Sequence, residues 1–235
     1  MGKVLRRWVL LALLVTLTAG LGPAAVSAQD GSDGGEDAPL DVSQFAGIEA
    51  AVARGYVASI TQEPVSGQLL TMSVMVLRFD SDRHAHDALD PVVGLLRDGL
   101  MEGGIALTEA TIDDGDVPGD EAVRYVVDSA ATPGAAATPD PDDELLAGLE
   151  LLAVRSGDTV VLVLGLPLEG KAGPALLAVA EAVLGRDAGT GAMTLDADGA
   201  STGGLFDRLP TEGDPVLAGT SPVSDMVLFP VEDGQ

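Results

Sequence analysis

The sequence predicts an α+β domain, with a mainly antiparallel sheet of about six strands and two main helices packed on it. Six short stretches are rich in apolar residues, and several of them alternate with the period of two that is typical of strands. Two longer stretches instead have the helical period of 3.6. Hairpin-type links outnumber helical crossovers between the stretches, which favours antiparallel pairing.

Two strands and a helix make up the first half of this domain. Residues 48–56 alternate as a strand, although Ser43 also allows a short capped helix before it. Residues 68–79 are the clearest strand, and we expect them to be central in the sheet. Residues 81–100 take the helical period. Pro91 interrupts them, so one kinked helix and two short helices are both open.

The second half contains four strands and the last helix. The strands are predicted over residues 105–112, 121–128, 149–155 and 159–166. The last two form a hairpin, because Ser156, Gly157 and Asp158 between them are typical of a turn. Residues 131–144, rich in Pro, Ala and Asp, predict an exposed loop. The final helix covers residues 173–184.

The chain before the domain has the pattern of an export signal. Residues 1–28 predict a signal peptide, since basic residues precede an apolar run of about 14 residues and Val26 and Ala28 fit the cleavage positions. This run is short for a membrane span of roughly 20 residues, although an uncleaved anchor stays open. We therefore expect a secreted or extracellular protein, or one associated with the cell envelope. Residues 29–42 predict a disordered acidic leader.

The predicted domain covers residues 43–186, and a Gly/Thr/Pro-rich tail follows over residues 187–235. Two apolar islands interrupt the tail, at residues 205–209 and 226–231. A purely solvated tail does not need such residues. Either the islands fold back on the domain and add an edge strand, or they dock on another molecule.

The chain is strongly acidic, with 37 Asp and Glu residues against 12 Lys and Arg residues and a formal net charge of −25. Nucleic acids and anionic membrane surfaces are bound through basic patches, so we expect neither as a partner. We also expect no membrane span after cleavage of residues 1–28. The sequence has no cysteine, and the fold therefore does not depend on disulfides.

Three motifs have the spacing of functional sites but lack part of the chemistry. Residues 165–172 match most of a phosphate-binding loop, yet Ala172 replaces the Ser or Thr that holds magnesium. Residues 199–203 fit G-x-S-x-G without a preceding buried strand. Residues 194–205 fit the start of an EF-hand loop, but Leu205 replaces the final acid. We expect no catalytic, cofactor or metal site from them.

His84 and His86 are the only histidines, and several aspartates near them give the appearance of a metal cluster. Residues two apart on a helix lie about 200° around its axis, so these two side chains do not share an ion. We expect no metal site here and expect both histidines to be dispensable for stability.

Three segments carry a resemblance to a known group of domains. They are RFDSDRHAHDAL at residues 78–89, GDEAVRYVV at residues 119–127 and AVRSGDTVVLVLG at residues 153–165. This pattern resembles extracellular α+β domains of high-GC bacteria, which include the sensor domains of mycobacterial-type serine/threonine kinases and PsbP-like lipoproteins. The shared motifs are structural, so the resemblance implies a fold and an extracellular setting and assigns no site residue.

The leading functional prediction is an exported, non-enzymatic binding or interaction domain. Its ligand, or its cell-envelope partner, would lie in a groove between sheet and helices. One alternative is a secreted hydrolase that uses carboxylates such as Asp113, Asp114 and Glu121. Another is an acidic envelope protein that buffers cations.

Overall fold

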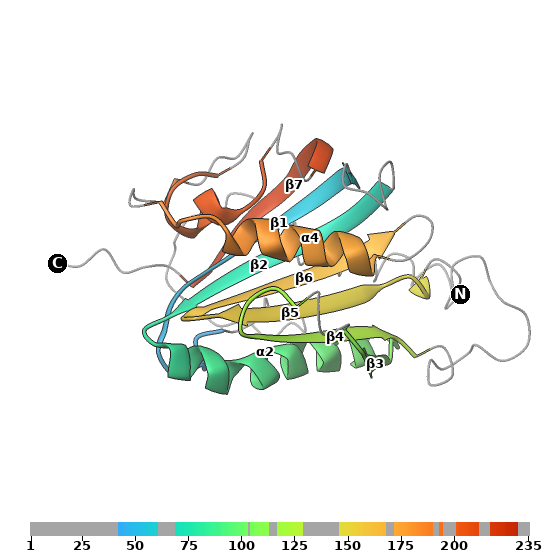
Figure 1. Ribbon diagram of the computed structural model, residues 1–235, viewed down its shortest axis with the longest axis horizontal. Helices are drawn as coiled ribbons and strands as arrows, with labels where there is room; N and C mark the ends of the chain where they lie inside the picture. The colour runs from blue at the N-terminus through green and yellow to red at the C-terminus, as the bar shows by residue number, and fades with distance from the viewer. Residues whose placement is uncertain are drawn as a thin grey trace, which may run out of the picture.

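A computed structural model describes residues 42–60, 69–102, 104–112, 117–128, 146–167, 172–189, 193–194, 201–211 and 217–229. These residues form one antiparallel sheet of seven strands with a helix on each face (Figure 1). The elements are β1 (Ile48–Ile60), β2 (Leu69–Phe79), α2 (Asp82–Glu102), β3 (Leu107–Ala110), β4 (Glu121–Val127), β5 (Glu150–Ser156), β6 (Thr159–Pro167), α4 (Gly173–Leu184), the 3-10 helix η1 (Gly204–Arg208) and β7 (Leu217–Phe229). The predicted α+β class is confirmed, with slightly more strands than expected.

The strand order in the sheet is β3-β4-β5-β6-β2-β1-β7. Strand β2 lies inside the sheet between β6 and β1, as its strong apolar pattern predicts. Strands β5 and β6 form the predicted hairpin, in which Ser156 pairs with Thr159. Its turn contains Gly157 at a φ of +57°, a left-handed conformation that favours glycine.

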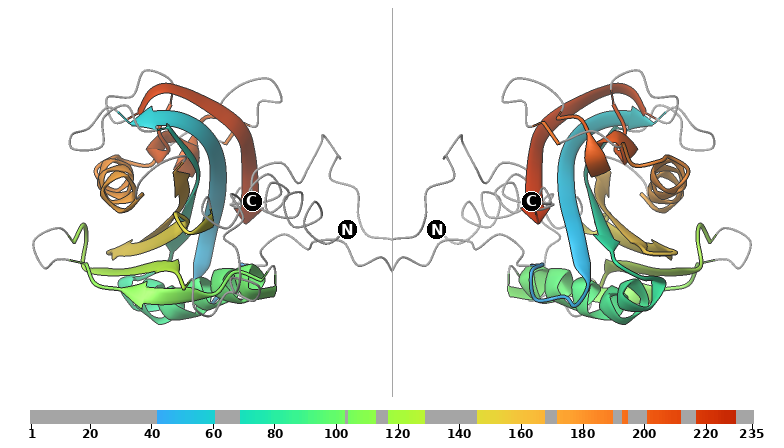
Figure 2. Two further views of the ribbon diagram at one scale, coloured as in Figure 1. Left: turned by 90° about the vertical axis from the view of Figure 1, so that its right-hand side faces the viewer. Right: turned by 90° about the vertical axis from the view of Figure 1, so that its left-hand side faces the viewer.

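Each face of the sheet has its own apolar core. Helix α2 packs through one stripe of side chains against one face, together with side chains from all seven strands. Helix α4 and η1 cover the other face. Figure 2 shows α2 and α4 on opposite sides of the curved sheet. Because both faces are covered, β6 is buried along nearly its whole length, which explains its continuous apolar sequence.

Helix α2 is a single helix that continues through Pro91, so the alternative of two short helices is not found. The helix ends in a Schellman motif. The N–H of Gly104 donates to the carbonyl oxygen of Met101 at 2.8 Å, and the N–H of Ile105 donates to the carbonyl oxygen of Leu100 at 2.9 Å. Gly104 has a φ of +83°, which is the reason for glycine at this position.

The sheet extends beyond residue 186, where the sequence analysis ends the domain. Strand β7 pairs with β1 along the edge of the sheet, and η1 packs into the core on the α4 face. This region is rich in Gly, Thr and Pro, so its composition does not indicate a strand. Strand β7 gains its hydrogen bonds from β1. Val42, the last residue of the predicted leader, is also buried.

Several predicted segments lie outside the described residues. They are the signal peptide, the rest of the acidic leader and the loop over residues 131–144. Strand β3 covers only four residues of the stretch predicted at 105–112. Among the helices that the structure describes, none has the length and apolarity to cross a membrane.

Candidate functional site

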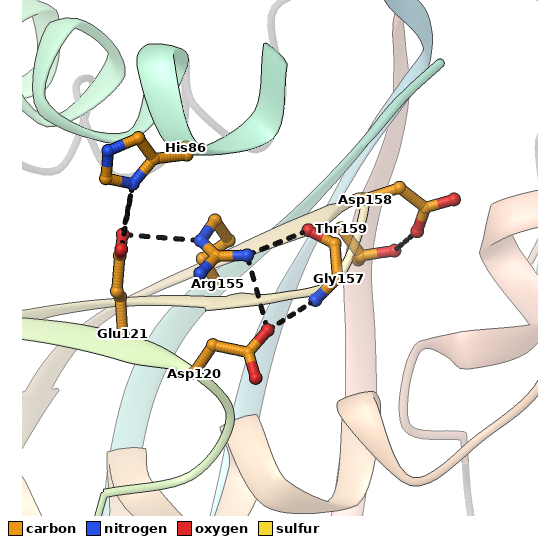
Figure 3. A network of polar contacts seen from close by, with 7 residues as sticks. All are labelled: His86, Asp120, Glu121, Arg155, Gly157, Asp158 and Thr159. Carbon is orange, nitrogen blue, oxygen red and sulfur yellow. Dashed lines mark hydrogen bonds and ion pairs between the residues drawn. The ribbon is translucent and has the colours of Figure 1, made fainter. Parts of the chain in front are cut away.

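A network of polar side chains lies where α2 approaches the start of β4 and the end of β5 (Figure 3). It consists of His86 on α2, Asp120 and Glu121 at the start of β4, and Arg155 near the end of β5. We call these four residues the polar network. It brings together one of the two histidines and one of the carboxylates that the sequence analysis considered separately.

Strand register explains why Glu121 belongs to this network. Glu121 is the register partner of Arg155 on β5, so both side chains lie on the same face of the sheet. Side chains alternate along a strand, and Glu121 is therefore in phase with Val123 and Tyr125, which pack on the α2 side. A charged residue in this phase lies beneath the polar flank of α2, where His86 is located.

Arg155 holds the network together. Its Nε donates to Glu121 Oε2 at 3.3 Å, and its Nη1 donates to Asp120 Oδ2 and to the carbonyl of Gly157, both at 3.2 Å. The N–H of Gly157 donates to the same Asp120 oxygen at 2.8 Å. The side chain of Arg155 is only 12% exposed. The base of the network is therefore fixed by the β5–β6 turn.

His86 forms the outer part of the network. Its Nδ1 lies 2.8 Å from Glu121 Oε1 and 3.0 Å from Oε2, and its side chain is 58% exposed. The hydrogen bond from His86, followed by that from Arg155, lowers the pKa of Glu121 below its usual value. An ionised carboxylate only accepts hydrogen bonds, so Nδ1 carries the proton. The second ring nitrogen points away from Glu121 (Figure 3) and is an acceptor when the ring is neutral.

His84 has a different partner from His86. Its Nδ1 contacts Asp80 one helical turn earlier, and this bond, followed by that from Ser81, lowers the pKa of Asp80. Ser81 also accepts a bond from the backbone N–H of His84 at 3.4 Å, as a helix cap does. Among the residues that the structure describes, no group of three or more His, Cys, Asp or Glu side chains could hold a metal ion.

The segment that matches a phosphate-binding loop is built differently. The N–H of Ala172, at the start of α4, donates to Glu150 Oε1 at 3.1 Å, and Arg124 holds the other oxygen of Glu150 at 2.6 Å. The protein's own carboxylate thus takes the place at the helix N-terminus where an anion would bind. The preceding residues 168–171 lie outside the described residues.

The other two motifs each contain a buried residue. Ser201, in the G-x-S-x-G match, is buried, and its backbone N–H donates to Asp225. Leu205, at the final position of the EF-hand match, is 1% exposed and packs on the α4 face. Both positions therefore serve the attachment of the C-terminal region. The candidate acids Asp113 and Asp114 lie outside the described residues.

The bond between His86 and Glu121 was missed in the sequence analysis because the helix was compared only with itself. A usable signal was present. Glu121 continues the alternation of Val123 and Tyr125, and it therefore faces whichever helix covers that side of the sheet.

Replacing both His84 and His86 with glutamine should change the free energy of unfolding by no more than about 0.5 kcal/mol. Both rings are more than one third exposed, and exposed ion pairs contribute little. Urea denaturation of the double variant measures this difference. A loss of 2 kcal/mol or more, on the order of a buried group, would show that the contacts stabilise the fold.

The unfolding free energy should fall in acid partly through Glu121. A carboxylate with a lowered folded-state pKa contributes stability above its unfolded value, here 4.5, and loses it as the pH falls through the folded value. The Glu121→Gln variant should therefore show a shallower decline than the wild type below pH 4.5. Parallel urea titrations between about pH 6 and pH 3 check this. Identical slopes would contradict the assignment.

The resemblance to sensor-type and PsbP-like domains remains a prediction from the sequence. No family model matched this chain, and no curated protein or solved structure matched it either.

Proposed function

We propose that this protein is an exported, non-enzymatic binding or interaction domain, and that the polar network is part of its binding surface. The observation that carries the proposal is that the inner residue of the network is fixed, whereas its outer residues are exposed to solvent. Arg155 is nearly buried, whereas the side chains of His86 and Asp120 are 58% and 54% exposed. The export signal predicted at residues 1–28 supports a partner outside the cell or in its envelope.

A network of this kind is suited to a polar, neutral ligand such as a sugar or a short peptide. His86 offers its outer ring nitrogen, and Asp120 offers carboxylate oxygens. These groups are already held by hydrogen bonds to Arg155 and Glu121, so a ligand would not need to order them. The large negative charge of the chain disfavours anionic ligands.

The same geometry supports a second candidate, a secreted hydrolase. A carboxylate bonded to one nitrogen of histidine orients the ring and stabilises its protonated form, which leaves the other nitrogen to act as a base. In this protein the carboxylate is that of Glu121, and it contacts Nδ1 of His86. Water would then be the nucleophile, and the exposed site would give only modest rates.

Thermal shift measurements with a defined panel test the proposal. The panel contains oligosaccharides of N-acetylglucosamine, short peptides ending in alanine, and calcium chloride. A ligand at about 100 times its Kd adds roughly 2.7 kcal/mol, which raises the melting temperature by about 5–10 °C for a chain of this size. The shift should be present in the wild type and strongly reduced in His86→Gln.

His84→Gln is the matched control, because it makes the same change two residues away and outside the network. A shift that survives in both variants would contradict binding at the polar network. Turnover of ester, amide or glycoside substrates that is lost only in His86→Gln would favour the hydrolase. Stabilisation by calcium or salt alone, equal in all variants, would favour the cation-buffering alternative.

A further inference from the structure

A buried arginine joins the C-terminal region to the sheet at a point remote from the polar network. Arg54 lies on β1, on the face covered by α4 and η1, and its side chain is 0% exposed. Its partners come from the two segments at residues 201–211 and 217–229. Strand β7 is an edge strand, so these segments lie at one edge of the sheet.

The guanidinium of Arg54 contacts both segments. Its Nε and Nη2 donate to the Asp225 carboxylate on β7, the latter at 3.0 Å. Nη2 also donates to the carbonyl of Ser201 at 2.6 Å, and Nη1 reaches the carbonyl of Pro210 at 3.4 Å. The guanidinium carbon lies 5.5 Å from the centre of the Phe206 ring.

Two further bonds tie the same elements together. Asp225 accepts a hydrogen bond from the N–H of Ser201, and the hydroxyl of Tyr56 donates to the Pro210 carbonyl at 3.0 Å. If one segment left alone, Arg54 or Asp225 would remain buried with part of its bonding lost. Unpaired buried charge is costly, so the two segments should leave together.

The backbone ladder between β1 and β7 is less regular than the ladder between β1 and β2. The β1–β7 ladder contains register shifts at three places, whereas the β1–β2 ladder contains one. Arg54 and Asp225 are opposite each other in the β1–β7 register. Their ion pair therefore selects a strand that carries a carboxylate at this position.

We propose that residues 201–211 and β7 form one cooperative unit, the C-terminal clasp, which Arg54 holds on β1 and which detaches only as a whole. The edge of β1 that this clasp covers accepts an extended strand with a carboxylate opposite Arg54. The occupant of this edge in the structure is the chain's own β7. This inference does not depend on the proposed function of the polar network.

Hydrogen exchange of the full chain tests the cooperativity. In Asp225→Asn, amides of both segments should exchange at least about a hundredfold faster and by similar factors, while those of β5 and β6 stay unchanged. The matched control is Glu150→Gln, which makes the same carboxylate-to-amide change in the ion pair with Arg124 and should leave both segments unchanged. Faster exchange of β7 alone, with residues 201–211 unaffected, would overturn the proposal.

If Asp225→Asn fails to fold, Phe206→Leu provides the reciprocal test. It weakens only the first segment, so a cooperative clasp requires faster exchange in β7 as well. Unchanged exchange in β7 would again overturn the proposal.

A labelled peptide with the sequence of residues 217–229 tests the acceptor edge. In the full-length Asp225→Asn protein, or in Phe206→Leu if that variant is needed, fluorescence anisotropy should show binding of this peptide. A peptide with the Asp225→Asn change should bind at least tenfold more weakly, and the wild-type protein should bind either peptide more weakly still. Equal binding of the two peptides, or no binding of either, would overturn the assignment of the acceptor edge.

Discussion

Replacing Arg54 with methionine should lower the free energy of unfolding by about 3–5 kcal/mol. The change leaves the carboxylate of Asp225, which is 4% exposed, buried without its main partner. Burial is the largest single effect on the pKa of Arg54 and lowers it, but the hydrogen bonds and electrostatic interactions with Asp225 and Tyr56 together outweigh burial and raise this pKa. Urea denaturation followed by circular dichroism measures the loss.

The double variant Arg54→Met, Asp225→Leu separates charge from packing. An apolar pair of similar volume often matches or exceeds a buried ion pair in stability, so most of the loss should be recovered. A double variant as unstable as the single one would show that the lost bonds to Ser201 and Pro210, and not the stranded carboxylate, dominate the effect.

Truncation after Arg186 should lower the melting temperature strongly and increase the binding of dyes to exposed apolar surface. It removes the buried large apolar side chains of Leu205, Phe206, Leu209 and Met226. Each contributes roughly 1.5–3 kcal/mol, and the sum is comparable to the total stability of an ordinary domain. The truncation also leaves β1 as an unpaired edge.

The full-length chain and a truncation after Phe229 are the controls for this experiment, since the second removes no described element. A domain that melts at the same temperature after removal of residues 187–235, and stays monomeric, would contradict the role of these residues in the fold. Docking of the apolar islands on an external partner would then be the better interpretation.

Sequence periodicity was enough to predict an element wherever that element depends mainly on its own residues. Helix α4 begins and ends at the predicted residues, because Gly173-Pro174 and Gly185 bound an apolar run at helical spacing. Strand β2 and the β5–β6 hairpin were predicted for the same reason. These signals are local, and tertiary packing strengthens them.

The candidate site was much less predictable. His86 and Glu121 are 35 residues apart in the chain, and their bond depends on which side of the sheet α2 covers. From the sequence, His86 is a possible metal ligand and Glu121 a possible catalytic acid, and nothing in their spacing places the two side chains close together. Only the strand register and the position of α2 bring them together.

The sequence by itself therefore determined the α+β class, the order of the first six strands and two helices, and the acidic, cysteine-free character of the chain. Tertiary structure alone decided that β7 completes the sheet, that Arg54 is buried against Asp225, and that His86 meets Glu121. The physical reason is the separation along the chain between the residues that interact. Periodicity records which face of an element is buried, whereas edge pairing and buried ion pairs depend on partners that only the folded chain brings close.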